Sequence, residues 1–204
     1  MKTFDVLIIG GGAAGMSCAL ILGSAKTKTF AHDKNIGIVM HQKSSALTSG
    51  KFYNALGLPS GITGKEILEN GKNHISENYS HINQIEKERV IKVVNENDSF
   101  IISTNKNTYK SKLIVIAIGA SKNFKIEGLT QFIEPHKSLP EAKERIQLKN
   151  SNHLVEDGIY VAGVLAGWRS QFSIASGSGA QVATDILTLW NNGEPAMVHD
   201  TIFD

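Results

Sequence analysis

The sequence predicts an α/β fold in which a parallel sheet carries a small antiparallel meander. Two observations at opposite ends of the 204-residue chain support this prediction. Near the start, the apolar run Val6–Ile9 leads directly into a glycine-rich turn, as expected for a strand buried on both faces of a parallel sheet. Near the end, Tyr160–Val164 again combines apolar residues with a glycine. We therefore expect the two ends of the chain to form two halves of one site.

The first glycine turn has the G-x-G-x-x-G spacing, with glycines at Gly10, Gly12 and Gly15. Gly10 permits the tight turn, Gly12 lets the backbone approach a pyrophosphate, and Gly15 allows close packing of helix and strand. A helix to about Leu22 follows, and its N–H groups and positive dipole end would face the phosphates. Because a buried strand precedes the turn and a helix follows it, the motif favours a Rossmann-like nucleotide site over a purely structural turn.

The second strand is predicted at Ile36–Met40. A dinucleotide fold usually has an acidic residue at the end of this strand, where it binds a ribose hydroxyl. This chain has His41 and Gln42 instead, and Asp33 precedes the strand, at the wrong end of the sheet. His41 or Gln42 is therefore expected on the ribose side, with a solvent-exposed loop as the alternative.

Composition indicates an ordinary globular protein of one or two domains. There are 21 basic and 19 acidic residues, and 41% of the residues are hydrophobic. The net charge of +2 is too small to indicate nucleic-acid binding. No apolar stretch reaches membrane-spanning length and no leader precedes the first strand, so we expect a cytoplasmic protein with no membrane or nucleic-acid partner.

The single cysteine, Cys18, limits the redox and metal chemistry of the chain. It cannot form an intramolecular disulfide, a CxxC pair or a cysteine-rich metal site, and no metal site is predicted. We expect Cys18 to be a small buried packing residue, with a reactive thiol as the alternative.

A second helix is predicted from Gly64 to about Tyr79. Thr63 is its candidate cap, and Glu66 three positions later completes a capping-box pattern.

Three short strands follow this helix, at Val90–Val94, Phe100–Thr104 and Thr108–Lys110. The turn-forming clusters 95–98 and 105–107 separate them, as in an antiparallel meander.

Two more helices are predicted in the second half of the chain. The stretch from Ser138 to about Lys149 has a proline near its start and acidic residues in its first turn, which favours one short helix. From Phe172 to about Trp190, apolar residues recur with helical spacing, and small residues in the first turns would let another backbone or a ligand come close.

Four collinear segments resemble thioredoxin reductases and related FAD-dependent pyridine nucleotide-disulfide oxidoreductases. They are the first glycine turn, the stretch Asn54–Pro59 with Gly61–Gly64, the strand and turn Leu113–Ala120, and the segment from Gly158 through Gln171 to Ala180. The resemblance implies one FAD-binding domain over residues 1–204, with a first FAD segment at 1–120, a short bridge at 121–157 and a second FAD segment at 158–204. It also implies that the last helix points its N-terminus at the flavin ring, where negative charge gathers on reduction, and that Val90 meets the adenine; a purely structural Val90 is the alternative.

The glycine motif and the resemblance together give the expected FAD contacts, whereas no residue is assigned a catalytic role. The contacts are Gly10, Gly12, Ala13, Ala14, Gly15, His41, Gln42, Leu47, Thr48, Asn54, Val90, Ala117, Ile118, Gly119, Gly163, Val164, Gln171 and Phe172.

The chain departs from the family pattern in its middle and at single positions. Only 43 residues, 120 to 162, stand where thioredoxin reductases insert an NADPH domain, and they contain no second glycine fingerprint and no cysteine. An independent domain typically needs about 100 residues. In addition, Val164 replaces the family's ribityl-binding Asp, and Ser170 replaces a usual Arg.

These features predict an FAD-binding oxidoreductase of thioredoxin reductase-like type that exchanges electrons with an external donor and acceptor. An external nicotinamide or a redox partner protein would then deliver the electrons, and a homodimer is a further possibility. Two alternatives stay open: a non-catalytic FAD-binding or redox-sensing module, and a degenerate scaffold that has lost turnover.

Overall fold

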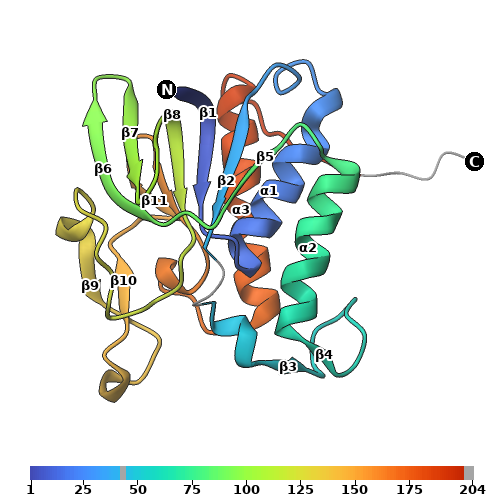
Figure 1. Ribbon diagram of the computed structural model, residues 1–204, viewed down its shortest axis with the longest axis vertical. Coiled ribbons are helices and arrows are strands. Elements are labelled where there is room, and N and C mark those ends of the chain that lie inside the picture. Colours follow the sequence, from blue (N-terminus) through green and yellow to red (C-terminus); the bar gives the residue numbers. More distant parts are fainter. Residues whose placement is uncertain (42–44, 200–204) are drawn as a thin grey trace, which may run out of the picture.

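A mainly parallel sheet forms the centre of the computed structural model, which describes residues 1–41 and 45–199 (Figure 1). Its strands run in the order β11-β12-β8-β1-β2-β5, and all except β11 are parallel to their neighbours. The bounds are β1 Lys2–Ile9, β2 Ile36–Met40, β5 Asn83–Glu86, β8 Thr108–Ile116, β11 Leu154–Glu156 and β12 Ile159–Val161. This arrangement confirms the predicted Rossmann-like α/β fold. The short strand β5 was not predicted.

The predicted antiparallel meander is present, but its third strand is longer than expected. β6, Val90–Glu96, pairs with β7, Ser99–Thr104, and β7 pairs with β8. β8 continues without a break from the meander into the parallel sheet, where it lies between β1 and β12. The prediction of separate strands at Thr108–Lys110 and from Leu113 was therefore wrong.

The polar pair Ser111 and Lys112 is accommodated within β8. Ser111 is fully buried, and its hydroxyl donates to the Leu113 carbonyl at 2.6 Å. The Lys112 ammonium lies 3.0 Å from the Asp5 carboxylate. Satisfied polar groups of this kind let a strand continue through polar positions.

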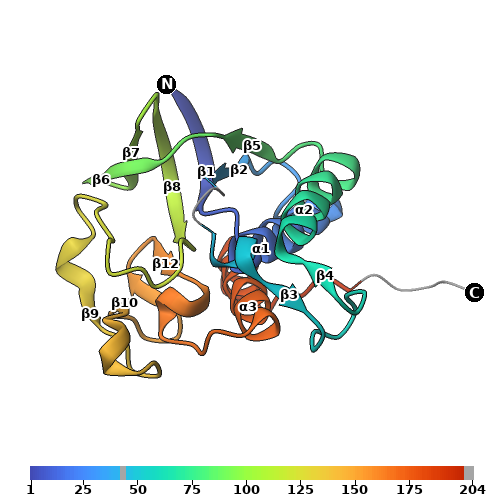
Figure 2. The same ribbon diagram turned by 60° about the horizontal axis from the view of Figure 1, so that its bottom comes forward.

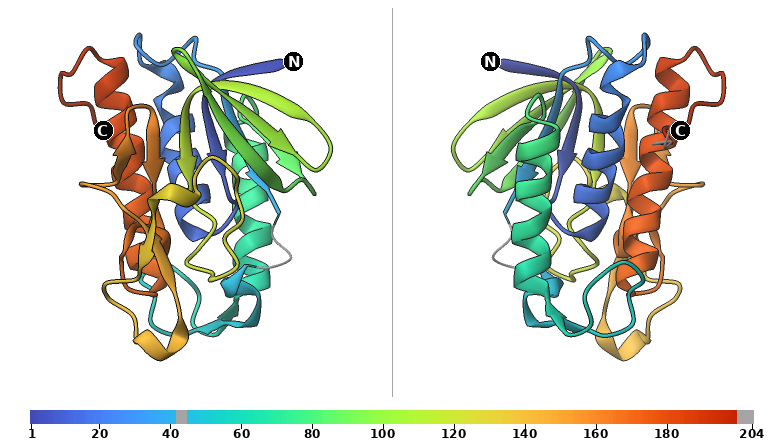
Figure 3. Two further views of the ribbon diagram at one scale, coloured as in Figure 1. Left: turned by 90° about the vertical axis from the view of Figure 1, so that its left-hand side faces the viewer. Right: turned by 90° about the vertical axis from the view of Figure 1, so that its right-hand side faces the viewer.

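Three helices cover one face of the sheet, as the right-hand view of Figure 3 shows. They are α1, Ala13–Ser24, α2, Gly64–Asn78, and α3, Phe172–Trp190. Apolar side chains of the helices pack with the facing residues of β1 and β2, whereas the meander and the segment after β8 cover the opposite face. Cys18 lies fully buried in the helical layer, and burial raises the pKa of its thiol, so the prediction of a packing residue is confirmed.

The segment 121–157 forms short strands and turns instead of the predicted helix. β9, Ile133–Pro135, pairs with β10, Ile146–Leu148, and within the predicted helix Glu141–Lys143 forms a 3₁₀ turn. The proline and acidic residues that indicated a helix start were misleading here, because Leu148 is fully buried in β10 and Glu144, at φ +46°, ends the 3₁₀ turn in the left-handed region. Just after this pair, β11 adds an antiparallel edge strand to the main sheet.

A small hairpin precedes α2. Its strands are β3, Lys51–Phe52, and β4, Ile62–Thr63, and it too was not predicted. Within the described ranges, no helix is both long and apolar enough to cross a bilayer. The same residues contain no group of three or more His, Cys, Asp or Glu side chains arranged to hold a metal ion.

Candidate functional site

A cavity of about 580 Å³ lies at the carboxyl ends of the parallel strands. Figure 2 looks toward this end of the sheet. The cavity is lined by Ile9 at the end of β1, Ala117 just after β8 and Ala162 just after β12, together with loops from both halves of the chain. Ligands of open α/β sheets bind in this position, where loops leave the strands in opposite directions.

The first glycine turn has no room for side chains at two of its three glycines. Gly10 has φ +124°, and a Cβ on it would lie 2.4 Å from the Ala117 carbonyl oxygen. A Cβ on Gly15 would lie 1.8 Å from the carbonyl oxygen of Gly10. A Cβ on Gly12 would meet only the Ser45 hydroxyl, at 4.0 Å, so at this position the open backbone faces the cavity. This division of roles is the one that the sequence predicted.

The N-termini of α1 and α3 both reach the cavity without a side-chain cap. Among the described residues, no side chain accepts a hydrogen bond at either helix start, and neither first turn contains an acidic residue. Gly12, Ala13 and Ala14 line the cavity from α1, and Gln171 and Phe172 line it from α3. The first N–H groups of a helix have no partner within the helix, so the two helices offer donors and positive dipole ends to one cavity.

The start of α2 provides a contrast within the same molecule. The Thr63 hydroxyl accepts from the Glu66 N–H at 3.3 Å, and the Glu66 carboxylate accepts from the Thr63 N–H at 2.8 Å. This is the predicted capping box, and the N-terminus of α2 does not line the cavity. The two helices that face the cavity are therefore the two that lack caps.

Direct contact between α1 and α3 joins the two halves of the site. Gly163 has φ +74°, and a Cβ on it would lie 3.0 Å from the Ala14 Cβ. A Cβ on Gly179 would lie 1.9 Å from the Ala14 carbonyl oxygen. Ala14 thus meets residues 149 and 165 positions further along the chain, because glycines at both positions leave room for it.

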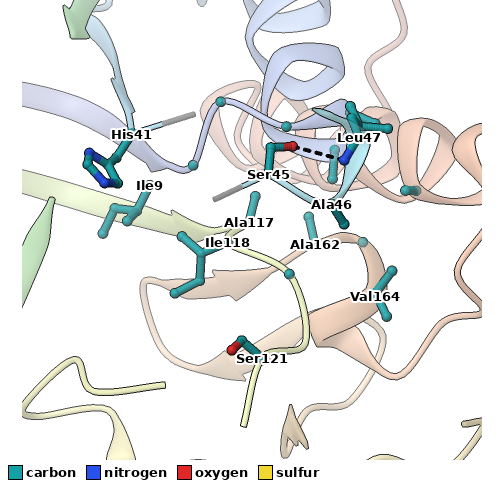
Figure 4. A pocket seen from close by; sticks show the side chains of 18 of the residues that line it. Ile9, His41, Ser45, Ala46, Leu47, Ala117, Ile118, Ser121, Ala162 and Val164 are labelled. Carbon is teal, nitrogen blue, oxygen red and sulfur yellow. Dashed lines mark hydrogen bonds between the residues drawn. The ribbon is translucent and has the colours of Figure 1, made fainter. Parts of the chain in front are cut away.

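Basic groups line the cavity near the end of β2. Figure 4 shows His41 at one end of the cavity and Val164 toward the other. The Lys87 N–H donates to the Met40 carbonyl at 3.1 Å, which brings Arg89 to the same region, and Lys125 also lines the cavity. Within the described residues, neither Arg89 nor Lys125 forms an ion pair with a carboxylate.

Glu88, the one acidic residue among the described residues of the lining, is engaged in hydrogen bonds within the protein. Burial acts to raise its pKa, but hydrogen bonds from Thr104, Asn107 and Tyr109 outweigh this effect and hold the pKa of Glu88 below its ordinary value. The carboxylate therefore ties the segment before β6 to β7 and β8, and its oxygens are already engaged within the protein.

The cavity brings most of the predicted contacts together. Those that line it are Gly10, Gly12, Ala13, Ala14, His41, Leu47, Val90, Ala117, Ile118, Gly119, Gly163, Val164, Gln171 and Phe172. Gly15, Thr48 and Asn54 do not: Gly15 packs against Gly10, the Thr48 hydroxyl donates to the Ser45 carbonyl at 2.8 Å, and Asn54 is exposed in the β3–β4 turn. Gln42 lies outside the described residues.

Several lining residues were not predicted, among them Ser45, Phe52, Arg89 and Lys125. The Ser45 hydroxyl accepts from the Leu47 N–H at 3.3 Å and so begins a 3₁₀ turn over the cavity, as Figure 4 shows. The ring of Phe52 packs edge-on against Phe172, with centroids 5.8 Å apart. A serine before a short turn is a cap signal that sequence can provide, whereas the Phe52–Phe172 contact depends on how the β3–β4 hairpin packs.

Comparison with known proteins finds one matching family model and similar solved structures. A family model described as pyridine nucleotide-disulphide oxidoreductase matches residues 4–169. A thioredoxin reductase from Gloeobacter violaceus is similar in structure, with a TM-score of 0.71, 15% identity and 100% of each chain covered.

Two further solved structures show the same fold. A ferredoxin-flavin thioredoxin reductase from Clostridium acetobutylicum has a TM-score of 0.67 and 19% identity, with 94% of this chain and 99% of that chain covered. The atypical thioredoxin reductase TRi from Desulfovibrio vulgaris Hildenborough has a TM-score of 0.67 and 15% identity, with 95% and 100% covered. No curated protein matches the sequence.

Proposed function

The chain belongs to the pyridine nucleotide-disulphide oxidoreductase family, and from this premise we propose that it is an FAD-binding oxidoreductase that exchanges electrons with an external donor and acceptor. The observation that carries the proposal is the convergence of two uncapped helix N-termini on one cavity at the carboxyl ends of the parallel strands. A dinucleotide has a central pyrophosphate, and helix N-termini are favourable sites for anions.

The residues of the cavity fit this cofactor at its polar and apolar ends. The bare backbone at Gly12 lets a pyrophosphate approach the start of α1, while the start of α3 supplies a second set of N–H groups. His41 and Arg89 offer donors near the end of β2. Apolar groups, with the Phe52–Phe172 pair among them, would exclude water from the other part. FAD itself supplies the electron transfer when bound.

The electron donor and acceptor are proposed to be separate molecules. The segment 121–157 is a short set of strands and turns and carries no second glycine fingerprint. The buried, singly occurring Cys18 is not suited to thiol relay, because burial raises its pKa and the thiolate is the reactive form. An external nicotinamide or a redox partner protein would then reduce the flavin; a homodimer is also proposed.

The direct test is the visible spectrum of the purified protein and its anaerobic reduction by NADH, NADPH and dithionite. A flavin spectrum, or uptake of added FAD, with reduction by a nicotinamide or a redox protein is expected. FAD uptake with no electron exchange would favour the redox-sensing alternative. A protein that neither contains FAD nor takes it up would contradict the proposal.

Substitution of Gly12 tests the site without disturbing the fold. Gly12→Asp places a carboxylate into open space beside the expected pyrophosphate, so FAD affinity should fall by at least about tenfold through charge repulsion. Gly177→Asp is the matched control, since Gly177 is exposed, has open space around it and does not line the cavity. Titration with FAD and far-UV circular dichroism measure affinity and fold. Equal affinity of the two variants would contradict the assigned site.

A further inference from the structure

His153 is a buried histidine behind the cavity wall, between β11 and α3. It is 5% exposed, and both it and Asn152 have left-handed backbones, with φ +73° and +46°. Residues other than glycine rarely adopt this conformation unless the surrounding structure fixes them. His153 does not line the cavity itself.

The imidazole connects two segments that reach the cavity. The Trp168 indole Nε1–H donates to His153 Nε2 at 2.9 Å, and the same nitrogen lies 2.9 Å from the Ser178 hydroxyl. That hydroxyl accepts from the Gly163 N–H at 2.8 Å. The planes of the two rings are inclined by 27°, and their centroids lie 5.8 Å apart.

The donor at Trp168 defines the protonation of His153. An indole N–H can only donate, so His153 Nε2 must accept and carries no proton. The ring is therefore neutral, with its proton on Nδ1. An imidazolium would present an N–H to the indole N–H, and the two donors would repel.

This contact lies directly behind both parts of the second half of the site. Gly163 is a lining residue, and Trp168 begins the exposed loop that leads to the lining residues Ser170, Gln171 and Phe172. The turn between them is also held from the same side: His136 Nε2 lies 2.8 Å from the Val164 carbonyl, and the Ser138 hydroxyl donates to the Gly167 carbonyl at 3.0 Å. Val164 has no polar side chain that could anchor a ligand, so any polar contact at this position would have to come from the backbone.

We propose that neutral His153 is a positioning residue for the cofactor, which holds the Gly163 turn and the Trp168 loop in their binding form, and that proton uptake by His153 releases both. The inference rests on the proposed function, because the cofactor is FAD in that proposal. FAD then binds the protein with neutral His153 better than the protein with charged His153. The affinity for FAD therefore falls as the pH decreases and His153 takes up a proton. For one linked proton, the fall is at most about tenfold per pH unit.

The groups that face His153 support neutrality at neutral pH. Burial lowers the pKa of His153 most, and the positive charge of Lys137 adds to this, while Asp185 on α3 and a hydrogen bond to the Asn152 backbone act in the opposite direction. The net direction is a pKa below the ordinary value near 6.5. We therefore expect His153 to take up a proton only in acidic solution.

The first experiment measures the FAD dissociation constant by fluorescence titration between about pH 5 and pH 8, the range in which histidines titrate. The wild-type protein should bind FAD more weakly as pH falls. His153→Gln, whose amide oxygen can accept from Trp168 but does not titrate, should bind within a few-fold of wild type at neutral pH and lose the pH dependence. His153→Phe, which offers no acceptor, should bind weakly at every pH.

Two matched variants separate His153 from other histidines. His41→Gln removes the imidazole in the cavity lining, and His74→Gln removes an exposed one on α2. His74→Gln should bind FAD as the wild type does at every pH, and His41→Gln, whatever its affinity at neutral pH, should keep the acid loss of affinity. An unchanged pH dependence in His153→Gln, or its loss in His41→Gln alone, would overturn the proposal.

The second experiment tests the hydrogen bond between Trp168 and His153 in the absence of any cofactor. Nitrogen NMR of the full-length protein should show His153 protonated at Nδ1 only, and a Trp168 indole proton protected from exchange until the pH falls. Trp190 is the internal reference, and Trp168→Phe assigns the signal. An Nε2-protonated His153 or a pH-independent Trp168 signal would overturn the proposal. Absence of FAD uptake at every pH, with the expected NMR behaviour, would instead be a failure of the proposed function.

Discussion

Single glycines decide how closely the two halves of the site approach. Gly179 and Gly177 lie two positions apart in α3, yet their surroundings differ. A Cβ on Gly179 would lie 1.9 Å from the Ala14 carbonyl oxygen, whereas a Cβ on Gly177 would meet nothing within 4 Å. The same residue type thus has a packing role at one position and none at the other.

Alanine substitutions should separate these roles. Gly179→Ala forces α1 and α3 apart and should lower the free energy of unfolding by more than about 2 kcal/mol. Gly177→Ala should raise it by about 0.5–1 kcal/mol, because alanine is the better helix former. Urea denaturation measures both. Similar effects at the two positions would contradict the close crossing of α1 and α3.

At the scale of elements, the three helices differ in how they begin. α2 satisfies its first N–H groups with its own capping box, while α1 and α3 begin at the cavity. β8 also has two roles: one edge pairs with β1 from Tyr109 to Ile116, while the other edge pairs first with β7 of the meander and then with β12 of the parallel sheet. We therefore expect the start of α2 to contribute to stability, and the starts of α1 and α3 to contribute to ligand binding.

Removal of the α2 cap should affect stability alone. Thr63→Ala loses the hydroxyl that accepts from the Glu66 N–H and should cost about 1 kcal/mol of unfolding free energy. FAD affinity should not change, since Thr63 does not line the cavity. Glu66→Gln is the control, because glutamine also completes a capping box. Chemical denaturation and FAD titration test this; a large loss of affinity in Thr63→Ala would contradict the separation.

For the whole molecule, the cavity lies where the glycine turns at Gly10 and Gly163 meet, so a ligand there should stabilise the complete fold. The Gly10 turn and the Gly163 turn contact each other through Ala14, and the segment 121–157 supports the second turn through His136 and His153. The cavity thus depends on all three parts of the sequence.

FAD should therefore stabilise the protein as a unit. At a free FAD concentration of 100 times the dissociation constant, the free energy of unfolding should increase by about 2.7 kcal/mol. Thermal denaturation with and without FAD measures the increase, and Gly12→Asp should lose most of it. A stable protein whose midpoint does not respond to FAD would favour the degenerate scaffold.

Sequence reasoning was most successful where a pattern depends on near neighbours. The bounds of β2 and α3 agree with the predicted ranges Ile36–Met40 and Phe172–Trp190, and the capping box at Thr63 and Glu66 is confirmed. The same holds for the geometry of the glycine turn at Gly10 and Gly12. It failed at Ser138–Lys149, where a proline and acidic residues indicated a helix start, whereas Leu148 is buried in a strand that pairs with β9.

The sequence by itself therefore determined the fold class, the helix α3 and the backbone character of the glycine turn, because these follow from apolar periodicity, capping and glycine geometry over a few residues. Only the tertiary structure decided that β8 is one strand, that Arg89 and Lys125 reach the same cavity, and that His153 joins Trp168 to Ser178. The physical reason is the same for all three features. Each depends on contacts between segments far apart in the chain, and such contacts leave no periodic signal in the local sequence.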